Sequence, residues 1–192
     1  MPKKLILLIG APGSGKTTDA TIIAKNHADI TSYSLGELLK DEAKKDTKTG
    51  KISRVFLEKG ELVPTGIVLD TICGAIQNSP TQIVLIDGFP RKEKQMKLFG
   101  DLVADINRVD LYSVIEIRVS RKVAKARVKS LGNFDEDIFC NSMEIYQNTI
   151  EDIEKFYNKD GLLKVIDGER ESSAVIADIN TFLKEQIELT PA

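Results

Sequence analysis

The stretch LILLIGAPGSGKTT, residues 5–18, combines a short apolar run with a glycine-rich segment. Residues 5–9 are continuously apolar, which predicts a strand buried on both faces of a parallel sheet. Residues 10–17 match the pattern G-x-x-x-x-G-K followed by Ser or Thr, in which a loop joins a strand to a helix. Glycines let such a loop bring its N–H groups close to phosphate oxygens, and the helix N-terminus adds partial positive charge. The stretch therefore predicts an α/β protein with a P-loop that binds a nucleotide.

Two side chains of this loop have specific expected roles. Lys16 should reach the β- and γ-phosphates of the nucleotide, and the Thr17 hydroxyl should bind Mg²⁺. Asp87 ends another apolar run, so in a parallel sheet it emerges at the same edge as the loop. There it could hold Mg²⁺, directly or through water. The alternative is an ordinary turn residue in an Asp-Gly pair.

Short apolar runs alternate along the chain with longer stretches of helical period, which is the pattern of a parallel sheet covered by helices. We expect one domain over residues 1–192, with helices flanking a five-stranded parallel sheet. The expected strands are 5–9, 30–34, 82–86, 112–119 and 162–166. Helices are expected at about 15–26, 34–45, 52–59, 64–78 and 120–130, and two more are marked by apolar residues within 138–157 and 176–187. The polar tract 44–51 is predicted to be a turn.

Several local expectations follow from these elements. Ser34 and Glu37 have the spacing of a capping box at the start of a helix. Glu116 alternates with apolar neighbours, which indicates a strand with one more exposed face. His27 follows the first helix in a polar stretch and is expected at the surface. The acidic residues 135–137 suit the first turn of a helix, where negative charge is favourable.

Composition excludes several classes of function. Hydrophobic residues make up 42% and charged residues 29%, as in a globular protein, and the formal net charge is −2. A net charge of this sign and size does not predict electrostatic binding to nucleic acid or to an anionic membrane. The apolar run near the N-terminus is too short for a signal peptide or a membrane span, so we expect a cytoplasmic protein. Cys73 and Cys140 have no Cys or His neighbours, which favours reduced thiols and no zinc.

Four further segments accompany the P-loop. They are DGFPR at 87–91 with Gln95 four positions on, GELVP at 60–64, SLGELLK at 34–40 and IDGER at 166–170. Together they resemble adenylate kinase, and the resemblance covers nearly the whole chain. It is closest to small bacterial members with a short lid and no zinc. It implies a P-loop kinase fold and a monomer, with an NMP-binding segment at about 34–63 and a lid at about 128–137.

The resemblance also implies roles for individual residues in transfer from Mg-ATP to AMP. Lys16, Arg91 and Arg127 would be the catalytic cations, since charge must be neutralised around the transferred group. The implied ATP site consists of Gly13, Ser14, Gly15, Lys16, Thr17, Thr18, Arg127 and Arg170. The implied AMP site consists of Leu35, Lys40, Glu61, Leu62, Val63, Gly88, Phe89, Pro90, Arg91 and Gln95. Arg91 would clamp the acceptor phosphate with two parallel hydrogen bonds, and Gln95 would contact the adenine edge.

The chain departs from the family pattern in two places. Leu35 and Lys40 stand where the family usually has Thr and Arg, so weaker AMP binding is expected because Lys lacks the planar fork of Arg. Lid residues 128–137 contain no arginine, and Ser142 stands where the family normally has one. Such an arginine is worth about 10³–10⁵ in rate. The local substitutes are Lys125, Lys129 and, less well placed, Arg121, unless these only solvate a helix surface.

Three functions remain open on sequence alone. The first is ATP:AMP phosphotransfer, at an ordinary or a reduced rate. The second is a nucleotide sensor that has lost most of its catalysis, suggested by an intact loop with a depleted lid. The third is a kinase with another acceptor, such as CMP, UMP or a non-nucleotide.

Overall fold

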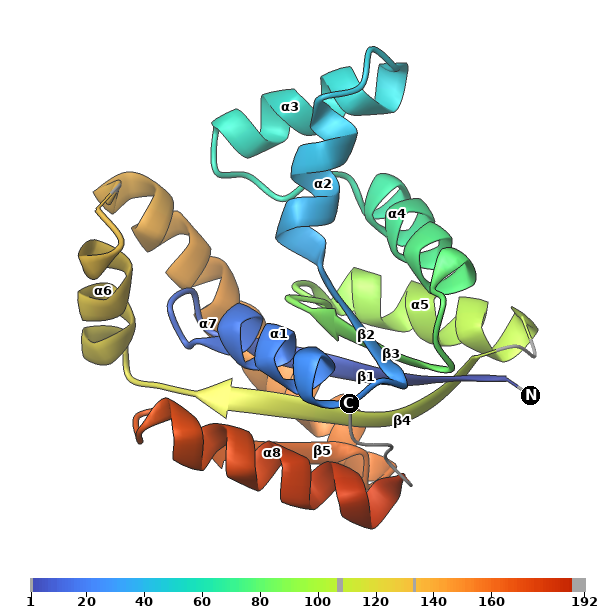
Figure 1. Cartoon of the computed structure of the whole chain (residues 1–192). Coiled ribbons are helices and arrows are strands. Elements are labelled where there is room, and N and C mark those ends of the chain that lie inside the picture. Colours follow the sequence, from blue (N-terminus) through green and yellow to red (C-terminus); the bar gives the residue numbers. More distant parts are fainter. Residues whose placement is uncertain (1, 107–108, 133, 188–192) are drawn as a thin grey trace.

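The computed structural model describes residues 2–106, 109–132 and 134–187 (Figure 1). Its centre is a sheet in the order β2-β3-β1-β4-β5, with every neighbouring pair parallel. The strands are β1 (Lys3–Gly10), β2 (Ile30–Ser34), β3 (Ile83–Asp87), β4 (Val109–Arg118) and β5 (Leu163–Asp167). The five predicted parallel strands are therefore confirmed, each within three residues of its expected bounds.

Helices cover both faces of this sheet, which explains the continuous apolar runs in β1 and β3. On one face, Leu5, Leu7 and Ile9 pack with α4 (Thr65–Asn78), α5 (Glu93–Ile106) and α7 (Glu136–Lys159). On the other face, Ile6 and Leu8 pack with α1 (Lys16–Asn26) and α8 (Ser172–Gln186). Alternate residues of β1 thus belong to two separate hydrophobic clusters.

Two parts of the chain project from this layered body. Figure 1 shows α2 (Leu35–Ala43) and α3 (Lys48–Glu58) rising from the sheet next to β2. A second projection is formed by α6 (Arg121–Ser130) and the start of α7. The space between the projections lies over the carboxyl ends of the strands, where ligands bind in open parallel sheets. Within the described ranges, no helix has the length and apolar character needed to cross a membrane.

The helix starts differ from expectation at three points. Helix α3 begins at Lys48, inside the predicted turn 44–51, because Thr47 Oγ1 accepts a hydrogen bond from the Gly50 N–H at 2.9 Å. The predicted capping box is wrong, since Ser34 makes no side-chain cap bond to any described residue and Glu37 pairs with Lys40 instead. Helix α5 had no counterpart among the expected elements. Asp135 does cap α7, by accepting from the Ile138 N–H.

Two polar residues are buried, although His27 was expected at the surface and Glu116 on a more exposed face of its strand. His27 is 6% exposed, and its Nε2 lies 3.0 Å from Asn180 Oδ1 on α8. Glu116 is fully buried because α7 covers its face of β4. Its carboxylate accepts hydrogen bonds from Tyr146 Oη at 2.8 Å and from Arg118 Nη2 at 2.8 Å, which compensate for its burial.

Candidate functional site

The loop between β1 and α1 can be formed only by small residues. Gly13 and Gly15 have φ angles of +78° and +98°, in the left-handed region that favours glycine. A Cβ at Gly13 would also lie 2.5 Å from the Ala124 carbonyl oxygen of α6. Ser14 is buried, and its N–H donates to Ala11 O at 3.1 Å, which closes the turn. The backbone is thus fixed in the bend that a phosphate cradle requires.

Lys16 is the cation of this loop. Its Nζ donates to Ala11 O at 3.1 Å, so the ammonium group folds back over the loop. Burial lowers the pKa of Lys16 to about 8, although the Asp87 carboxylate opposes this shift. Arg91 lowers the pKa further by charge repulsion. Because burial and charge repulsion destabilise the ammonium form of Lys16, a phosphate placed beside it would stabilise that form strongly.

Thr17 and Asp87 meet at the carboxyl ends of β1 and β3, as the parallel register requires. Thr17 Oγ1 donates to Asp87 Oδ2 at 2.5 Å, and Asp87 is 2% exposed. Asp87 Oδ1 is buried and has no hydrogen-bond partner among the described residues. An orphaned carboxylate oxygen beside a hydroxyl is a donor set that fits Mg²⁺. Nowhere in residues 2–106, 109–132 and 134–187 does a group of three or more His, Cys, Asp or Glu side chains form a site that could hold a metal ion.

Arg127 joins two loops at the edge of the site. Its Nη1 donates to Ser14 O at 3.2 Å and its Nη2 donates to Gly168 O at 2.8 Å. The guanidinium therefore braces the phosphate loop against the turn after β5. Arg170, on that turn, forms ion pairs with Asp178 and Asp167. Thr18 is exposed on the first turn of α1.

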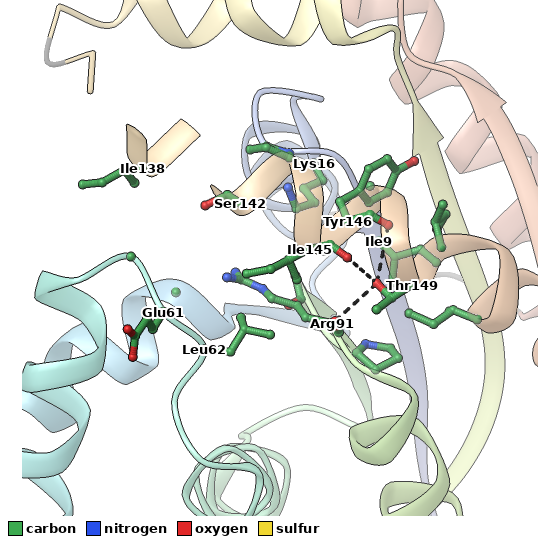
Figure 2. A pocket seen from close by; sticks show the side chains of 18 of the residues that line it. Ile9, Lys16, Glu61, Leu62, Arg91, Ile138, Ser142, Ile145, Tyr146 and Thr149 are labelled. Carbon is green, nitrogen blue, oxygen red and sulfur yellow. Dashed lines mark hydrogen bonds between the residues drawn. The ribbon is translucent and has the colours of Figure 1, made fainter. Parts of the chain in front are cut away.

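A cavity of about 280 Å³ opens beside Lys16. Figure 2 shows Lys16 and Arg91 together in it, with Glu61 and Leu62 on one side and α7 on the other. Arg91 Nε donates to Gly88 O at 2.8 Å, and burial lowers the pKa of its guanidinium. Two desolvated cations in one cleft indicate a site for more than one anionic group.

Comparison with known proteins agrees with this geometry. The profile of the adenylate kinase family matches residues 8–162. An adenylate kinase of Nitratiruptor sp. is 46% identical over 190 residues, covering 97% of this chain and 98% of its own length. Those of Sulfurovum sp. and Campylobacter lari are 42% and 44% identical, covering 96% and 95% of this chain and 100% and 98% of their own lengths.

The chain belongs to the adenylate kinase family. The resemblance seen in the sequence is thereby confirmed, and so is the P-loop kinase fold. Because the relatives match over almost their entire lengths, the similarity includes both projections as well as the sheet.

The residues predicted for the acceptor side of this adenylate kinase family member fall into two groups. The first group lines the cleft and consists of Lys40, Glu61, Leu62, Gly88, Pro90 and Arg91. The others are buried behind it: Leu35 at 1%, Val63 at 3%, Phe89 at 0% and Gln95 at 1% exposure. The Leu35 side chain packs in the core, so it presents no side-chain group to the cleft. Gln95 Oε1 accepts the Arg91 N–H at 2.8 Å, which ties it to the arginine.

One wall of the cleft was missed by reasoning from sequence. Residues of α7 line it at positions 138, 142, 145, 146, 149, 150 and 153, and of these the sequence pointed only to Ser142 as a site residue. Figure 2 places Ile138, Ser142 and Ile145 on the side facing Glu61 and Leu62. The spacing of three and four residues was visible, but it also fits a helix that packs only on the core.

The three cations proposed as substitutes for missing lid arginines have partners within the protein. Lys125 forms an ion pair with Glu136, and Arg121 Nη2 donates to Cys140 Sγ at 3.4 Å. Lys129 lies over the Phe134 ring, 5.0 Å from its centroid. None of these three lines the cleft around Lys16 in the described structure. The expected lid, 128–137, includes residue 133, which lies outside the described residues.

Proposed function

We propose that this protein transfers the γ-phosphoryl group of ATP to AMP and releases two molecules of ADP. Membership of the adenylate kinase family carries the reaction type. The observation that carries the site assignment is that Lys16 of the phosphate loop and Arg91 after β3 share one cleft. The two ends of the reaction, a triphosphate and a monophosphate, can therefore be held side by side.

In the proposed mechanism the phosphate loop holds ATP and Arg91 holds AMP. A phosphate oxygen of AMP forms a bond to the γ-phosphorus while the bond from that phosphorus to the β,γ-bridging oxygen breaks, leaving the electron pair on ADP. No side chain needs to remove a proton, because the AMP phosphate is already an anion. Lys16 and Arg91 neutralise the charge that spreads over the transferred group, and close positioning provides the rest of the acceleration.

Thr17 and Asp87 would hold Mg²⁺ with the phosphates of ATP. Mg²⁺ supplies charge neutralisation at the β- and γ-phosphates and fixes their orientation. The support is the orphaned Asp87 Oδ1 next to the Thr17 hydroxyl. Arg127, which braces Ser14 and Gly168, would keep the phosphate loop and the ATP-side turn near Arg170 in register.

The remaining parts of the proposal concern the two projections, the oligomeric state and the cellular location. Segment 34–63 would hold AMP, with Glu61 to Val63 contacting the base through backbone groups and Gln95 helping to select adenine. The segment 128–137 would act as a short lid that excludes water, so that ATP is not hydrolysed. We infer a monomer in the cytoplasm without nucleic-acid or membrane partners, in agreement with its composition.

The test is an assay of the purified protein with Mg-ATP and one acceptor at a time. ADP should form in a two-to-one ratio to AMP consumed, and CMP, UMP and GMP should react at least about 100-fold more slowly, because a pocket built to hydrogen-bond one base edge leaves polar groups unpaired with another. ATP binding without turnover by any acceptor would contradict the proposal. That outcome would identify a nucleotide sensor instead.

Binding of ATP should depend on pH through Lys16. Its pKa of about 8 in the free protein means that the side chain is mostly neutral above that pH, whereas nearby phosphates restore its charge. Binding must therefore take up a proton, and the affinity should fall by up to about tenfold per pH unit above pH 8. Calorimetry in buffers of different ionisation enthalpy measures this uptake. It should approach one proton at high pH, vanish near neutrality, and be absent in Lys16→Met.

Ser142→Arg should increase the rate of phosphotransfer. Ser142 lies on the cleft face of α7 and lines the same cavity as Lys16 and Arg91, so an arginine there can reach the phosphates. Because one additional well-placed cation or donor is worth about 10²-fold, we expect kcat to rise about 10- to 100-fold. Asn148→Arg, which adds the same charge at an exposed position of the same helix, is the control and should leave kcat unchanged. Equal effects of both variants would point to general electrostatic attraction instead.

A further inference from the structure

Helix α7 touches the acceptor-side projection directly. Asn141 Nδ2 donates a hydrogen bond of 2.8 Å to Gly60 O, a partner 81 positions away in the chain. Gly60 ends the turn after α3, with a φ of +65°, and is followed by the residues that line the acceptor side of the cleft. The bond thus bridges the two projections seen in Figure 1 across the mouth of the site.

A second contact supports the same bridge. A Cβ at Gly60 would meet Ile138 Cγ1 at 3.5 Å, an ordinary van der Waals contact, so the turn at Gly60 faces Ile138. Four residues of α7 are spaced three, one and three positions apart and therefore lie on one face of the helix: Ile138, Asn141, Ser142 and Ile145. That face serves both as the wall of the cleft and as the support for the turn at Gly60.

The turn at Gly60 makes few other hydrogen bonds among the described residues. The Gly60 N–H donates to Leu57 O at 3.1 Å and the Glu61 N–H donates to Phe56 O at 2.9 Å, both within the end of α3. These bonds fix the turn relative to α3, which itself belongs to the projection. Among the described hydrogen bonds of residues 60–62, only that from Asn141 connects the turn to an element outside the projection formed by α2 and α3.

We propose that Asn141 is a positioning residue for the acceptor nucleotide. By holding the Gly60 carbonyl, its side-chain amide fixes the backbone of residues 61–63 at the distance from Arg91 that a nucleoside monophosphate spans. The base is then bound by residues 61–63 and the phosphate by Arg91, which belong to different elements. Helix α7 holds these two parts of the acceptor site at a fixed separation. This inference rests on the proposed function, because it assumes that the cleft receives a nucleoside monophosphate.

The experiment compares the full-length protein with Asn141→Leu, which keeps the shape of the side chain but removes its donor. The Kd and KM for AMP should rise about tenfold, because the Gly60 carbonyl loses its partner and the turn is released. The Kd for Mg-ATP should stay within about twofold, since the phosphate loop is untouched. Asn141→Gln retains the donor and should recover most of the AMP affinity.

The matched control is Asn148→Leu, the same exchange at an exposed position of α7, which should change neither affinity. Unfolding temperatures identify any variant that is not folded, and Asn141→Asp, which also lacks a donor, then takes the place of Asn141→Leu. If the unchanged protein binds no AMP in calorimetry, the proposed function is wrong. If it binds AMP and the donor-less variants bind it equally well, or lose AMP and ATP affinity together, the positioning role alone is wrong.

Discussion

Lys16→Met should lower kcat by about 10³-fold while the protein stays folded. Lys16 is the cation of the phosphate loop, and it lies in the same cleft as Arg91. A preorganised donor aimed at charge that develops in the transition state is worth about 10²- to 10³-fold, and this donor also carries a full charge. Methionine keeps the length and apolar stem of the side chain, so the loss can be attributed to the ammonium group.

The measurement is steady-state formation of ADP, together with thermal unfolding. Removal of a desolvated charge leaves no cost of burial behind, so the unfolding temperature should stay the same or rise. Lys25→Met is the matched control, because Lys25 is exposed at the other end of the same helix and should be neutral in both measurements. A Lys16→Met protein with more than about a tenth of the original kcat would exclude Lys16 as a catalytic group.

The sheet and the phosphate loop could be predicted because their signals are local. Strands β1 and β3 each contain an uninterrupted apolar run, and the loop needs a fixed order of glycines between a strand and a helix. Asp87 was placed correctly for the same reason, since parallel strands bring their carboxyl ends to one edge. These features depend only on neighbours in sequence and on a general rule of topology.

Other features depended on distant contacts that leave no local signal. Glu116 alternates with apolar residues as an exposed strand residue would, yet α7 covers it and supplies Tyr146 as a partner. The partner of His27 is the Asn180 side chain, which lies 153 positions away in the sequence. In each case the sequence shows the residue type, whereas the partner is determined by packing.

The wall formed by α7 illustrates a different difficulty. Its cleft-facing residues, Ile138 and Ile145 among them, have the same apolar character as its core-facing residues Phe139 and Met143. A single helical wheel therefore shows two apolar stripes, and periodicity cannot tell which one meets the ligand. Family resemblance directed attention to the missing arginine at Ser142 but gave no reason to examine Asn141.

Arg91→Ala should reduce kcat/KM for AMP by about 10²- to 10³-fold and leave the Kd for Mg-ATP nearly unchanged. Arg91 is half-buried in the cleft, and its guanidinium is held by the Gly88 carbonyl through Nε, which leaves the Nη groups to bind phosphate. Loss of one partner from a desolvated charge pair costs about 2–5 kcal/mol. The acceptor phosphate would lose this partner, whereas the ATP phosphates would keep the phosphate loop and Lys16.

Arg91→Lys separates charge from geometry at this position. A lysine supplies the charge without the two parallel donors, so it should recover only part of the activity, about tenfold below the original protein. Lys92→Ala, at the exposed neighbouring position, is the control for changes in net charge and should behave like the original protein. If Arg91→Ala instead weakens Mg-ATP and leaves the kinetics of AMP unchanged, Arg91 serves the donor nucleotide. The acceptor would then have to be held by Lys40, the remaining basic side chain that lines the described cavity.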